Sequence, residues 1–510
     1  MGGEEMVTDS ILTVLVFLVP LAFALLIFLF GGISRVLREG AALVGIFFTL
    51  VISVMIAHRV LQGEVLTYWN MNFYVDGLSS LMELLGSAMG VIIIIYSLSY
   101  VNHHPRLGDL PVGRLRLYYG LILLFLSMMN WTCATNNIIM LYVSLEATTL
   151  ATAFLVTFYW RRESIEAGYK YLLLVTVGVT FALLGCVLIY SAGIPYLPRR
   201  NILLLTELGK VAGSIPHSIV LLAASLIIVG FGTKAGLVPF HAWLPDAHAE
   251  APIPVSALLS GIVIKVGAYA LARTITIFAP RFPAIILFVA ILCSFGMLVG
   301  MIMALVQDDI KRMLAYSSVS QIAYVIEGLG LGTYLGIYGG LFQLMNHTIT
   351  KALLFLTAGS LMFATGERAI SKLSLLRKRM PITAFCFFVG ALSISGMPPF
   401  NGFVSKFTIF LAVAEQGLLW AAVVAVVTGF LSVACFARAA YLLFWRRPAE
   451  GHGHGNPEGG SLPIQEPPPS MLFGMVVLSA LCILLGVYPQ LVHPMLDSAS
   501  RIVLKLLIGL

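Results

Sequence analysis

The stretch GFGTKAGLVPFHAWLPDAHAEAPIP, residues 230–254, places a lysine and several helix-breaking residues inside an apolar region, and it decides the fold. Gly236 and Pro239 closely follow Lys234, and both residue types disfavour a continuous helix. A helix break at bilayer depth is tolerated only where protein or water satisfies the freed backbone groups. A lysine at that depth costs about 2.5 to 3.5 kcal/mol on insertion scales, which indicates a working ionisable group. We therefore expect this segment to line an internal hydrated cavity.

A second stretch, SGMPPFNGFVSKFTIF at residues 395–410, repeats the arrangement later in the chain. Pro398, Pro399 and Gly402 interrupt the helix just ahead of Lys406. A plain proline kink would leave the adjacent lysine unexplained. Two broken helices with a lysine each are typical of a transporter built from repeated halves.

The spacing of basic residues also supports a duplication. Lys265 follows Lys234 by 31 residues (265 − 234), and Arg438 follows Lys406 by 32 (438 − 406), in each case one apolar span later. Counted along the chain, spans 4 to 8 and 9 to 13 form two units of five helices. An odd number of spans gives the two units opposite orientations, which is the inverted-repeat pattern of secondary transporters. The sequence thus predicts that Lys234 and Lys406 occupy equivalent positions.

The composition places the chain in a membrane. Of 510 residues, 59% are hydrophobic and 10% charged, and the mean hydropathy is +0.98, which excludes a soluble protein with a solvated surface. At about 20 residues per span we expect an all-α polytopic membrane protein with about 14 transmembrane helices, of which helices 7 and 12 are the broken ones. The basic residues behind the net charge of +7 lie mostly in short loops, where topology explains them, so nucleic acid is excluded as a partner.

The six cysteines lie singly, without a CxxC pair or a Cys/His cluster. Iron–sulfur and structural zinc sites need such clusters, so we expect no metal and no cofactor in this chain. His452 and His454 stand in a Gly/Pro-rich loop, and this composition indicates a linker rather than a metal site.

The apolar spans divide the chain into four parts. We expect N-terminal helices 1 to 3 at residues 1–116, a first inverted repeat at 117–281, a second at 282–447, and a loop, helix 14 and short tail at 448–510. Loops at the ends of odd-numbered spans carry most of the Lys and Arg residues, whereas those of even-numbered spans carry few, Arg273 among them. The positive-inside rule then puts the odd loops in the cytoplasm and both termini outside, in a cell (cytoplasmic or inner) membrane. The tail from Ser500 is too short to span and predicts a helix at the membrane interface.

Few other charges lie at membrane depth, and each is a candidate proton carrier. They are Glu83, Glu146, Lys265, Glu327, Lys351 and Arg438. A buried ion pair, or a side chain that reaches a helix end, explains such charges without transport, and for Lys351 the two interpretations weigh equally. Glu146 is the strongest candidate, because a mid-span carboxylate paired with a lysine can act as a switch. Glu327 is its expected counterpart, and His347, in span 11 between the two lysine sites, is suited to bridge them.

Four segments carry a family resemblance. They are KAGLVPFHAWLPDAHAEAPIPVSALLSGIVIKVGAYAL (234–271), DDIKRMLAYSSVSQIAY (308–324), NHTITKALLFLTAGS (346–360) and SGMPPFNGFVSKF (395–407). The chain resembles the antiporter-like subunits shared by respiratory complex I, Mrp-type cation/proton antiporters and membrane-bound NiFe hydrogenases, over spans 3 to 13. This resemblance implies 14 helices, two inverted five-helix units and a central hydrophilic axis.

The resemblance also implies roles for single residues. Glu146 matches the family's glutamate of span 5, Lys234 the lysine of the first broken helix, Lys265 the lysine of span 8, His347 the histidine of span 11, and Lys406 the terminal ionisable group of span 12. A lysine at the last position is similar to the Mrp D-type and hydrogenase H-type subunits. The short tail after span 14 argues against the largest complex I subunit.

The resemblance implies a proton-translocating subunit of a multisubunit complex, in which H⁺ moves along the axis and Na⁺, in an Mrp or hydrogenase setting, moves elsewhere. Its partners would be other membrane subunits, membrane lipid and, in a respiratory complex, a NiFe or iron–sulfur peripheral arm. The alternative within the family is a proton-pumping complex I subunit that works with NADH or ferredoxin and quinone. Two functions from other classes remain: a non-conducting membrane anchor of a redox arm, and a stand-alone Na⁺/H⁺ exchanger. The buried cations disfavour the anchor, and the lack of clustered carboxylates at depth disfavours the exchanger.

Overall fold

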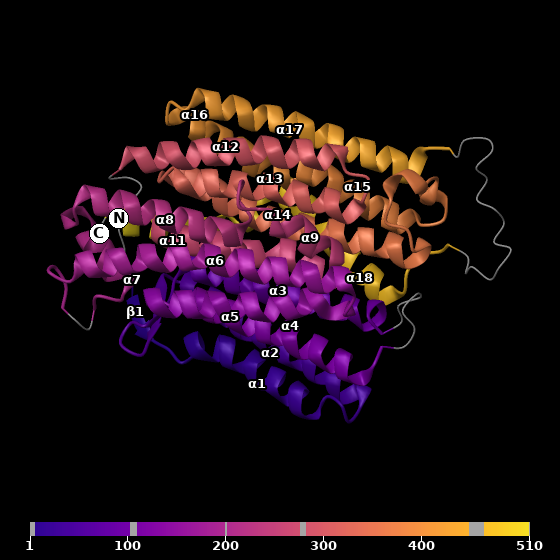
Figure 1. Cartoon of the computed structure of the whole chain (residues 1–510), viewed down its shortest axis with the longest axis horizontal. Helices are drawn as coiled ribbons and strands as arrows, with labels where there is room; N and C mark the ends of the chain where they lie inside the picture. Colours follow the sequence, from indigo (N-terminus) through magenta and orange to yellow (C-terminus); the bar gives the residue numbers. More distant parts are fainter. Residues whose placement is uncertain (1–5, 103–109, 199–200, 276–281, 448–463, 509–510) are drawn as a thin grey trace.

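The computed structural model describes residues 6–102, 110–198, 201–275, 282–447 and 464–508. Long helices lie side by side along the longest axis of the molecule (Figure 1). Helices satisfy their own backbone hydrogen bonds, which an apolar medium requires. The buried apolar side chains form one main core that extends from the first helix to the last. The predicted class, an all-α polytopic membrane protein, is confirmed.

The N-terminal part contains the three predicted helices. It also contains a small sheet, which was not predicted from the sequence. Its elements are β1 (Met6–Asp9), α1 (Leu12–Phe30), α2 (Arg35–Leu61), β2 (Glu64–Tyr68), β3 (Phe73–Val75) and α3 (Gly77–Tyr100). β1 pairs with β2 in parallel, Met6 opposite Glu64, and β2 pairs with β3 antiparallel, Leu66 opposite Val75. The strands are only three to five residues long, so the period-two pattern was too short to recognise.

The next helices correspond to the first predicted repeat. They are α4 (Val112–Ala134), α5 (Ile138–Val156), η1 (Thr157–Tyr159), α6 (Arg162–Gly193), α7 (Leu205–Val211), η2 (Ala212–Ser214), α8 (His217–Ala235), α9 (Trp243–Glu250), α10 (Ile253–Leu258), the π-turn η3 (Leu259–Val263) and α11 (Ile264–Ile275). α4 begins at Val112, ahead of the boundary predicted at residue 116. The division into repeats itself stays a prediction.

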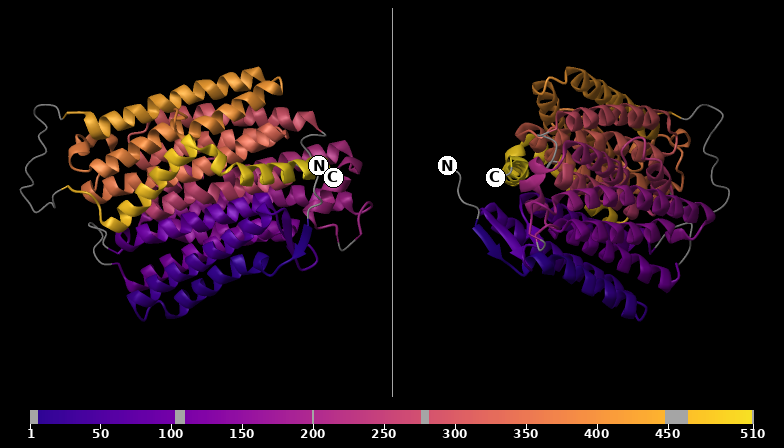
Figure 2. Two further views of the ribbon diagram at one scale, coloured as in Figure 1. Left: turned by 180° about the vertical axis from the view of Figure 1, so that it is seen from behind. Right: turned by 60° about the vertical axis from the view of Figure 1, so that its left-hand side comes forward.

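The remaining helices complete the bundle. They are α12 (Pro283–Val306), α13 (Ile310–Gly330), α14 (Tyr334–Thr365), η5 (Ile370–Lys372), η6 (Leu376–Lys378), α15 (Pro381–Ser395), α16 (Asn401–Glu415), α17 (Leu419–Ala440), the π-turn η7 (Tyr441–Trp445), α18 (Pro469–Val487), η8 (Pro489–Leu491) and α19 (His493–Ile508). The helix expected from Ser500 begins earlier, at His493. α18 and α19 follow one another along one side of the bundle (Figure 2), where both contact α3 and α14. That α19 lies at the membrane interface stays a prediction.

Twelve helical segments among the described residues are long and apolar enough to cross a membrane. The predicted number of 14 additionally requires α13, which is more polar, and the interrupted pair of α15 and α16. The exact number is therefore not confirmed. The polar composition of α13 and the break after α15 both belong to the interior of the bundle.

Both interrupted helices end in the same way. α8 ends at Gly236, whose φ is 80° and whose N–H donates to Gly232 O and Thr233 O. α15 ends at Gly396, with φ 76° and an N–H that donates to Leu392 O and Ser393 O. This left-handed glycine cap satisfies carbonyls that the broken helix frees. A cis peptide precedes the proline three residues after each of these glycines, Pro239 and Pro399.

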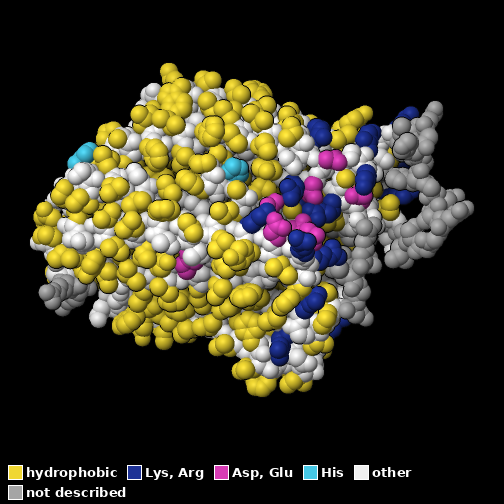
Figure 3. Space-filling model, in the orientation of Figure 1, with side chains coloured by type: hydrophobic (Ala, Val, Ile, Leu, Met, Phe, Trp, Pro, Cys, Tyr) yellow, Lys and Arg dark blue, Asp and Glu magenta, His cyan; other side chains and the backbone are white. Residues whose placement is uncertain are grey.

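The two ends of the molecule differ in charge. Lys and Arg side chains, with Asp and Glu among them, gather at one end (Figure 3), where Asp246 pairs with Lys170 and Arg312 and where Arg368 pairs with Glu250. We call this the basic end. The first strand, β1, lies at the opposite end (Figure 1), which we call the terminal end. α8 runs from the terminal end towards the break and α15 runs from the basic end, so the two broken helices point in opposite directions (Figure 1).

Candidate functional site

Lys234 lies in the last turn of α8 and is held by side-chain hydroxyls. It is 0% exposed, and its Nζ donates to Thr149 Oγ1 of α5 (2.8 Å) and to Tyr171 OH of α6 (3.0 Å). α6 comes this close to α8 because Gly178 has no side chain, and a Cβ there would lie 2.5 Å from Thr233 Cβ. Small residues of this kind let membrane helices approach each other. The packing of α5, α6 and α8 thus fixes the lysine in a polar pocket.

Glu146 lies one turn before Thr149 on α5 and is half-buried. Its Oε2 accepts a hydrogen bond from Thr176 Oγ1 (3.3 Å), while its Oε1 is buried without a hydrogen-bond partner in the described residues. The charge of Glu146 acts on Lys234, although the two form no direct ion pair in this part of the chain. A carboxylate close to a lysine but not bound to it can make or break that contact, as a switch requires.

Lys265 lies at the start of α11, in a helical segment that is wholly buried. Its Nζ donates to Ser260 O, a carbonyl of the π-turn η3. The hydroxyl of Ser260 in turn lies 2.7 Å from Ser318 Oγ on α13. π-turns inside helices occur often at functional sites. The turn connects Lys265 with the polar face of α13.

His347 and Lys351 lie one turn apart on α14, and both are buried. Lys351 Nζ donates to Leu314 O (2.8 Å) and to Ser317 Oγ on α13. Neither ring nitrogen of His347 has a hydrogen-bond partner among the described residues. The charges of Lys265, Lys351 and Lys406 all act on His347. The structure therefore places Lys351, which the sequence left undecided, in the same interior as His347.

Lys406 lies on α16 beyond the second break and is bound to the broken end of α15. Its Nζ donates to Ile394 O (2.8 Å) and lies 4.9 Å from the centre of the Tyr324 ring. α16 can approach α15 because Gly402 lacks a side chain, and a Cβ there would lie 1.9 Å from Ser393 O. The lysine thus supplies the hydrogen bond that one freed carbonyl needs.

A network of amides and hydroxyls surrounds the second break, and the sequence analysis missed it. Its members are Gln321, Gln343, Asn346, Thr350, Ser393, Asn401 and Ser405. They come from α13, α14, α15 and α16, and all are buried. Asn and Gln inside apolar spans are the signal that could have shown it, since such groups bond across membrane helices.

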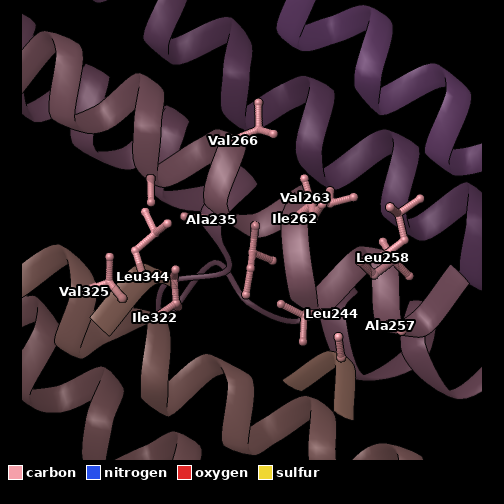
Figure 4. Close-up of a cluster of buried hydrophobic side chains, with 14 of the residues drawn as sticks. Ala235, Leu244, Ala257, Leu258, Ile262, Val263, Val266, Ile322, Val325 and Leu344 are labelled. Carbon is pink, nitrogen blue, oxygen red and sulfur yellow. The ribbon is translucent and has the colours of Figure 1, made fainter. Parts of the chain in front are cut away.

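The two lysines nearest the first break differ in the charged neighbour that acts on each. Glu146 is the charge that acts on Lys234, whereas Lys351 is the charge that acts on Lys265. Ala235, directly after Lys234, belongs to a packed apolar cluster around the first break (Figure 4). Other labelled members are Leu244, Ile262, Val263, Val266, Ile322, Val325 and Leu344. These apolar side chains pack around the chain at the first break.

The expected equivalence of Lys234 and Lys406 is wrong in register. Lys234 precedes its capping glycine by two residues (236 − 234), whereas Lys406 follows Gly396 by ten (406 − 396). In the same register the counterpart of Lys406 is Asp246 (246 − 236 = 10), which forms ion pairs at the basic end. Because the two broken helices run in opposite directions, both lysines nevertheless lie on the half-helix that leads to the terminal end.

Two secondary candidates do not have the roles that the repeat would give them. Arg438 donates to Leu305 O (3.1 Å) and Gln307 O (3.2 Å) at the end of α12, which is a helix-capping role, so it is not a counterpart of buried Lys265. Glu327 is 1% exposed near the terminal end of α13, and no lysine charge among the described residues acts on it. It therefore does not repeat the Glu146–Lys234 arrangement.

Glu83 lies on α3. It is 0% exposed, and both carboxylate oxygens lack a hydrogen-bond partner in the described residues. The charges that act on it are those of Asp76 and Arg273. Arg273, which the sequence analysis assigned to a loop, is buried and paired with Asp76.

Metal ligands are not brought together in the described part of the chain. No group of three or more His, Cys, Asp or Glu side chains there could hold a metal ion. His452 and His454 lie outside the described residues. The expectation that the chain carries no cofactor stays a prediction.

Comparison with protein families and curated proteins gives a consistent result. The model of the family described as NADH:quinone oxidoreductase/Mrp antiporter, TM matches residues 135–432. The NADH-quinone oxidoreductase subunit N of Desulforudis audaxviator is 32% identical over 495 residues, which cover 94% of this chain and 96% of that protein. The Hydrogenase-4 component F homolog of Methylacidiphilum infernorum is 33% identical over 358 residues, 69% of this chain and 75% of that protein.

Among solved structures, a chain in the structure of the Mrp complex from Dietzia sp. DQ12-45-1b superposes with a TM-score of 0.86. The match covers 98% of this chain and 97% of that chain at 24% identity, so it concerns the fold.

Proposed function

The chain belongs to the NADH:quinone oxidoreductase/Mrp antiporter membrane family, and from that premise we propose that it moves protons along its buried Glu/Lys/His groups as one subunit of an ion-pumping complex. Protons enter from one side, pass Lys234, Lys265 and His347, and leave near Lys406. Glu146 controls the charge state of Lys234 and couples it to a neighbouring subunit. The chain itself carries out no redox chemistry.

His347 is the observation that carries this proposal furthest. A fully buried imidazole with two unbonded ring nitrogens, acted on by three lysines, can accept and pass on a proton. Lys351 bonds into the same interior and joins the proposed path. A membrane anchor without conduction does not require four buried lysines in such an arrangement.

The partners follow from the family. The two curated relatives are named as a subunit and as a component, and other membrane subunits are the partners of this chain as well. In a hydrogenase or respiratory complex we include a NiFe or iron–sulfur peripheral arm, and in an Mrp setting Na⁺ moves through other subunits. We place the basic end in the cytoplasm and both termini outside, because basic loops remain inside. Labelling of a Thr8→Cys variant by a membrane-impermeant reagent in intact cells tests this orientation.

Transport by the assembled complex in vesicles tests the function. A pH-sensitive dye inside the vesicles reports the proton flux, and we expect Lys234→Ala or Lys406→Ala to abolish it. Lys372→Ala, at an exposed lysine of the basic end, is the control that should transport normally. Wild-type flux in both interior variants would refute the proposal.

Two other outcomes would identify the alternatives. Exchange of Na⁺ for H⁺ by this chain alone would indicate a stand-alone exchanger. Normal redox turnover of the complex without any proton flux, in the wild type, would indicate a non-conducting anchor.

A further inference from the structure

A second group of buried charges lies where α3 meets α11, near the terminal end. Asp76 caps α3 by accepting from Ser79 N (3.0 Å) and is 0% exposed. Arg273, on the last described turn of α11, donates Nη1 to Asp76 Oδ2 (2.6 Å) and Nη2 to Asp76 Oδ1 (2.5 Å). This bidentate pair joins two helices that are far apart in sequence, and it is the strong geometry for such a pair.

Hydroxyl groups continue this group of charges inward. Arg273 Nε donates to Tyr269 OH (3.0 Å), which in turn donates to Cys133 O at the end of α4 (2.7 Å). Ser79 Oγ lies 3.1 Å from the same tyrosine oxygen. Tyr269 and Ser79 therefore connect the ion pair to the end of α4 through hydrogen bonds.

Glu83 is the member of this group whose burial is not explained by a contribution to the stability of the fold. It lies two turns beyond Asp76 on the same face of α3, and Asp76 and Arg273 both act on it. Arg273 already has its counter-charge in Asp76, so Glu83 is an additional acid. Its two oxygens have no hydrogen-bond donor in the described residues. A bare carboxylate is very costly to bury, so such a group binds a proton or faces a path.

α11 connects this group to the lysine interior. Lys265, Tyr269 and Arg273 are four residues apart, so they share one face of the helix. At 1.5 Å per residue, the step from Lys265 to Arg273 is about 12 Å along the helix axis. Glu83, on neighbouring α3, lies within electrostatic range of Arg273 at the outer part of this column.

We propose that Glu83 binds and releases protons, and that with the Asp76–Arg273 pair it connects Lys265 to the terminal end by a second branch, separate from the exit near Lys406. The inference rests on the proposed function, because it concerns the same proton flux. A proton given up by the Lys265 ammonium reaches the Glu83 carboxylate, and the proton that Glu83 releases passes to water at the terminal end. Arg273 is the nearby cation that stabilises Glu83 while it is ionised, and Asp76 holds Arg273 in place.

Infrared spectroscopy of the whole purified complex and proton flux in vesicles test this branch together. A protonated carboxylic acid has its own C=O stretching band, and we expect Glu83→Gln to remove one such band and to lower proton flux on the order of tenfold. Glu83→Asp keeps an acid at this site, so part of the band and of the flux should return. Ser80→Ala is the matched control, because Ser80 is a buried, uncharged residue on the same face of α3, one turn from both Asp76 and Glu83. Copurification of the partner subunits checks assembly.

The outcomes separate this branch from the proposed function. If Glu83→Gln transports normally and its infrared spectrum keeps every carboxyl band, while Lys234→Ala is inactive, the branch is refuted and the proposed function stands. If Lys234→Ala also transports normally, the proposed function itself fails. If the Glu83→Gln complex does not assemble, the Glu83→Asp complex decides. An assembled Glu83→Asp complex that shows neither the carboxyl band nor proton flux would also refute the branch.

Discussion

The two helix breaks use the same backbone device and treat their lysines differently. In each, a glycine of positive φ caps the first half-helix. At the first break Thr233 O accepts hydrogen bonds from both Gly236 N and Trp243 Nε1 (2.9 Å), so Lys234 is not needed there and binds side-chain hydroxyls. At the second break Lys406 itself satisfies the freed carbonyl Ile394 O. The comparison teaches that one lysine is free for proton chemistry while the other also holds the backbone together.

The two breaks should differ most in how much stability the protein loses when one methyl group is added. In the shared register, Gly402 of the second break corresponds to Ala242 of the first, each six residues past its glycine (402 − 396 and 242 − 236). A Cβ at Gly402 would lie 1.9 Å from Ser393 O, a backbone atom that cannot move freely. We expect Gly402→Ala to lower the free energy of unfolding by about 3 kcal/mol or more. A lower thermal midpoint of the complex would show this loss.

The reverse exchange is the control for this experiment. Ala242 is exposed and stands at the N-cap of α9, where glycine is well tolerated. Ala242→Gly should therefore change stability by less than about 0.5 kcal/mol. Equal effects of the two variants would contradict the claim that only the second break depends on close helix contact.

Removal of each lysine should sharpen the comparison further. Lys406→Met leaves the buried carbonyl Ile394 O without its donor, whereas Lys234→Met leaves two hydroxyls that can rotate to other acceptors. An unsatisfied buried acceptor costs about 1 to 3 kcal/mol. We expect the Lys406→Met complex to be less stable than the Lys234→Met complex by that free energy. It should therefore unfold at a lower temperature under identical conditions. A lower midpoint for Lys234→Met would reverse the assignment of roles.

The part of this arrangement that the sequence predicts is the part that short motifs carry. Gly236 and Pro239, and Pro398 and Pro399, mark the two breaks in the sequence because glycine and proline act on the local backbone. The partners of the lysines could not be predicted, because Thr149, Tyr171 and Tyr324 belong to other helices and depend on packing. Lys265 follows Lys234, and Arg438 follows Lys406, by about one span, and this equal spacing suggested that Lys234 and Lys406 were equivalent. The register of each half-helix is instead set by its glycine cap.

The amide network and the Asp76–Arg273 pair show the same limit. Asn346 and Asn401 are 55 residues apart and meet only because α16 docks on α14. Arg273 was predicted from the sequence to belong to a loop, yet it is buried. Its burial depends on Asp76, which is 197 residues away in sequence.

The two aromatic neighbours of the lysines give a smaller, testable difference. Tyr171 accepts a hydrogen bond from Lys234 through its hydroxyl, whereas Tyr324 presents its ring to Lys406 and donates its hydroxyl to Ala425 O (2.6 Å). Tyr171→Phe should therefore raise the free-energy barrier to proton transfer by about 1 kcal/mol, which slows the proton flux roughly a few-fold. Tyr324→Phe keeps the ring face and should leave the flux close to wild type. A larger loss in Tyr324→Phe would show that its hydroxyl, not its ring, serves Lys406.

The smallest effect should come from α19, which lies at the terminal end that both lysine-bearing half-helices approach. Burial alone would raise the pKa of Asp497 on α19, but hydrogen bonds from Tyr334 OH and Arg501 hold that pKa below its usual value. A lowered folded-state pKa contributes stability that is present above the unfolded value and lost as the pH falls through the folded one. We therefore expect α19 to keep its hydrogen-exchange protection at neutral pH and to lose part of it only below about pH 4. Tyr334→Phe removes one donor and should move this loss to higher pH. Unchanged protection of α19 in Tyr334→Phe across the acid range would show that apolar contacts alone hold the helix on α3 and α14.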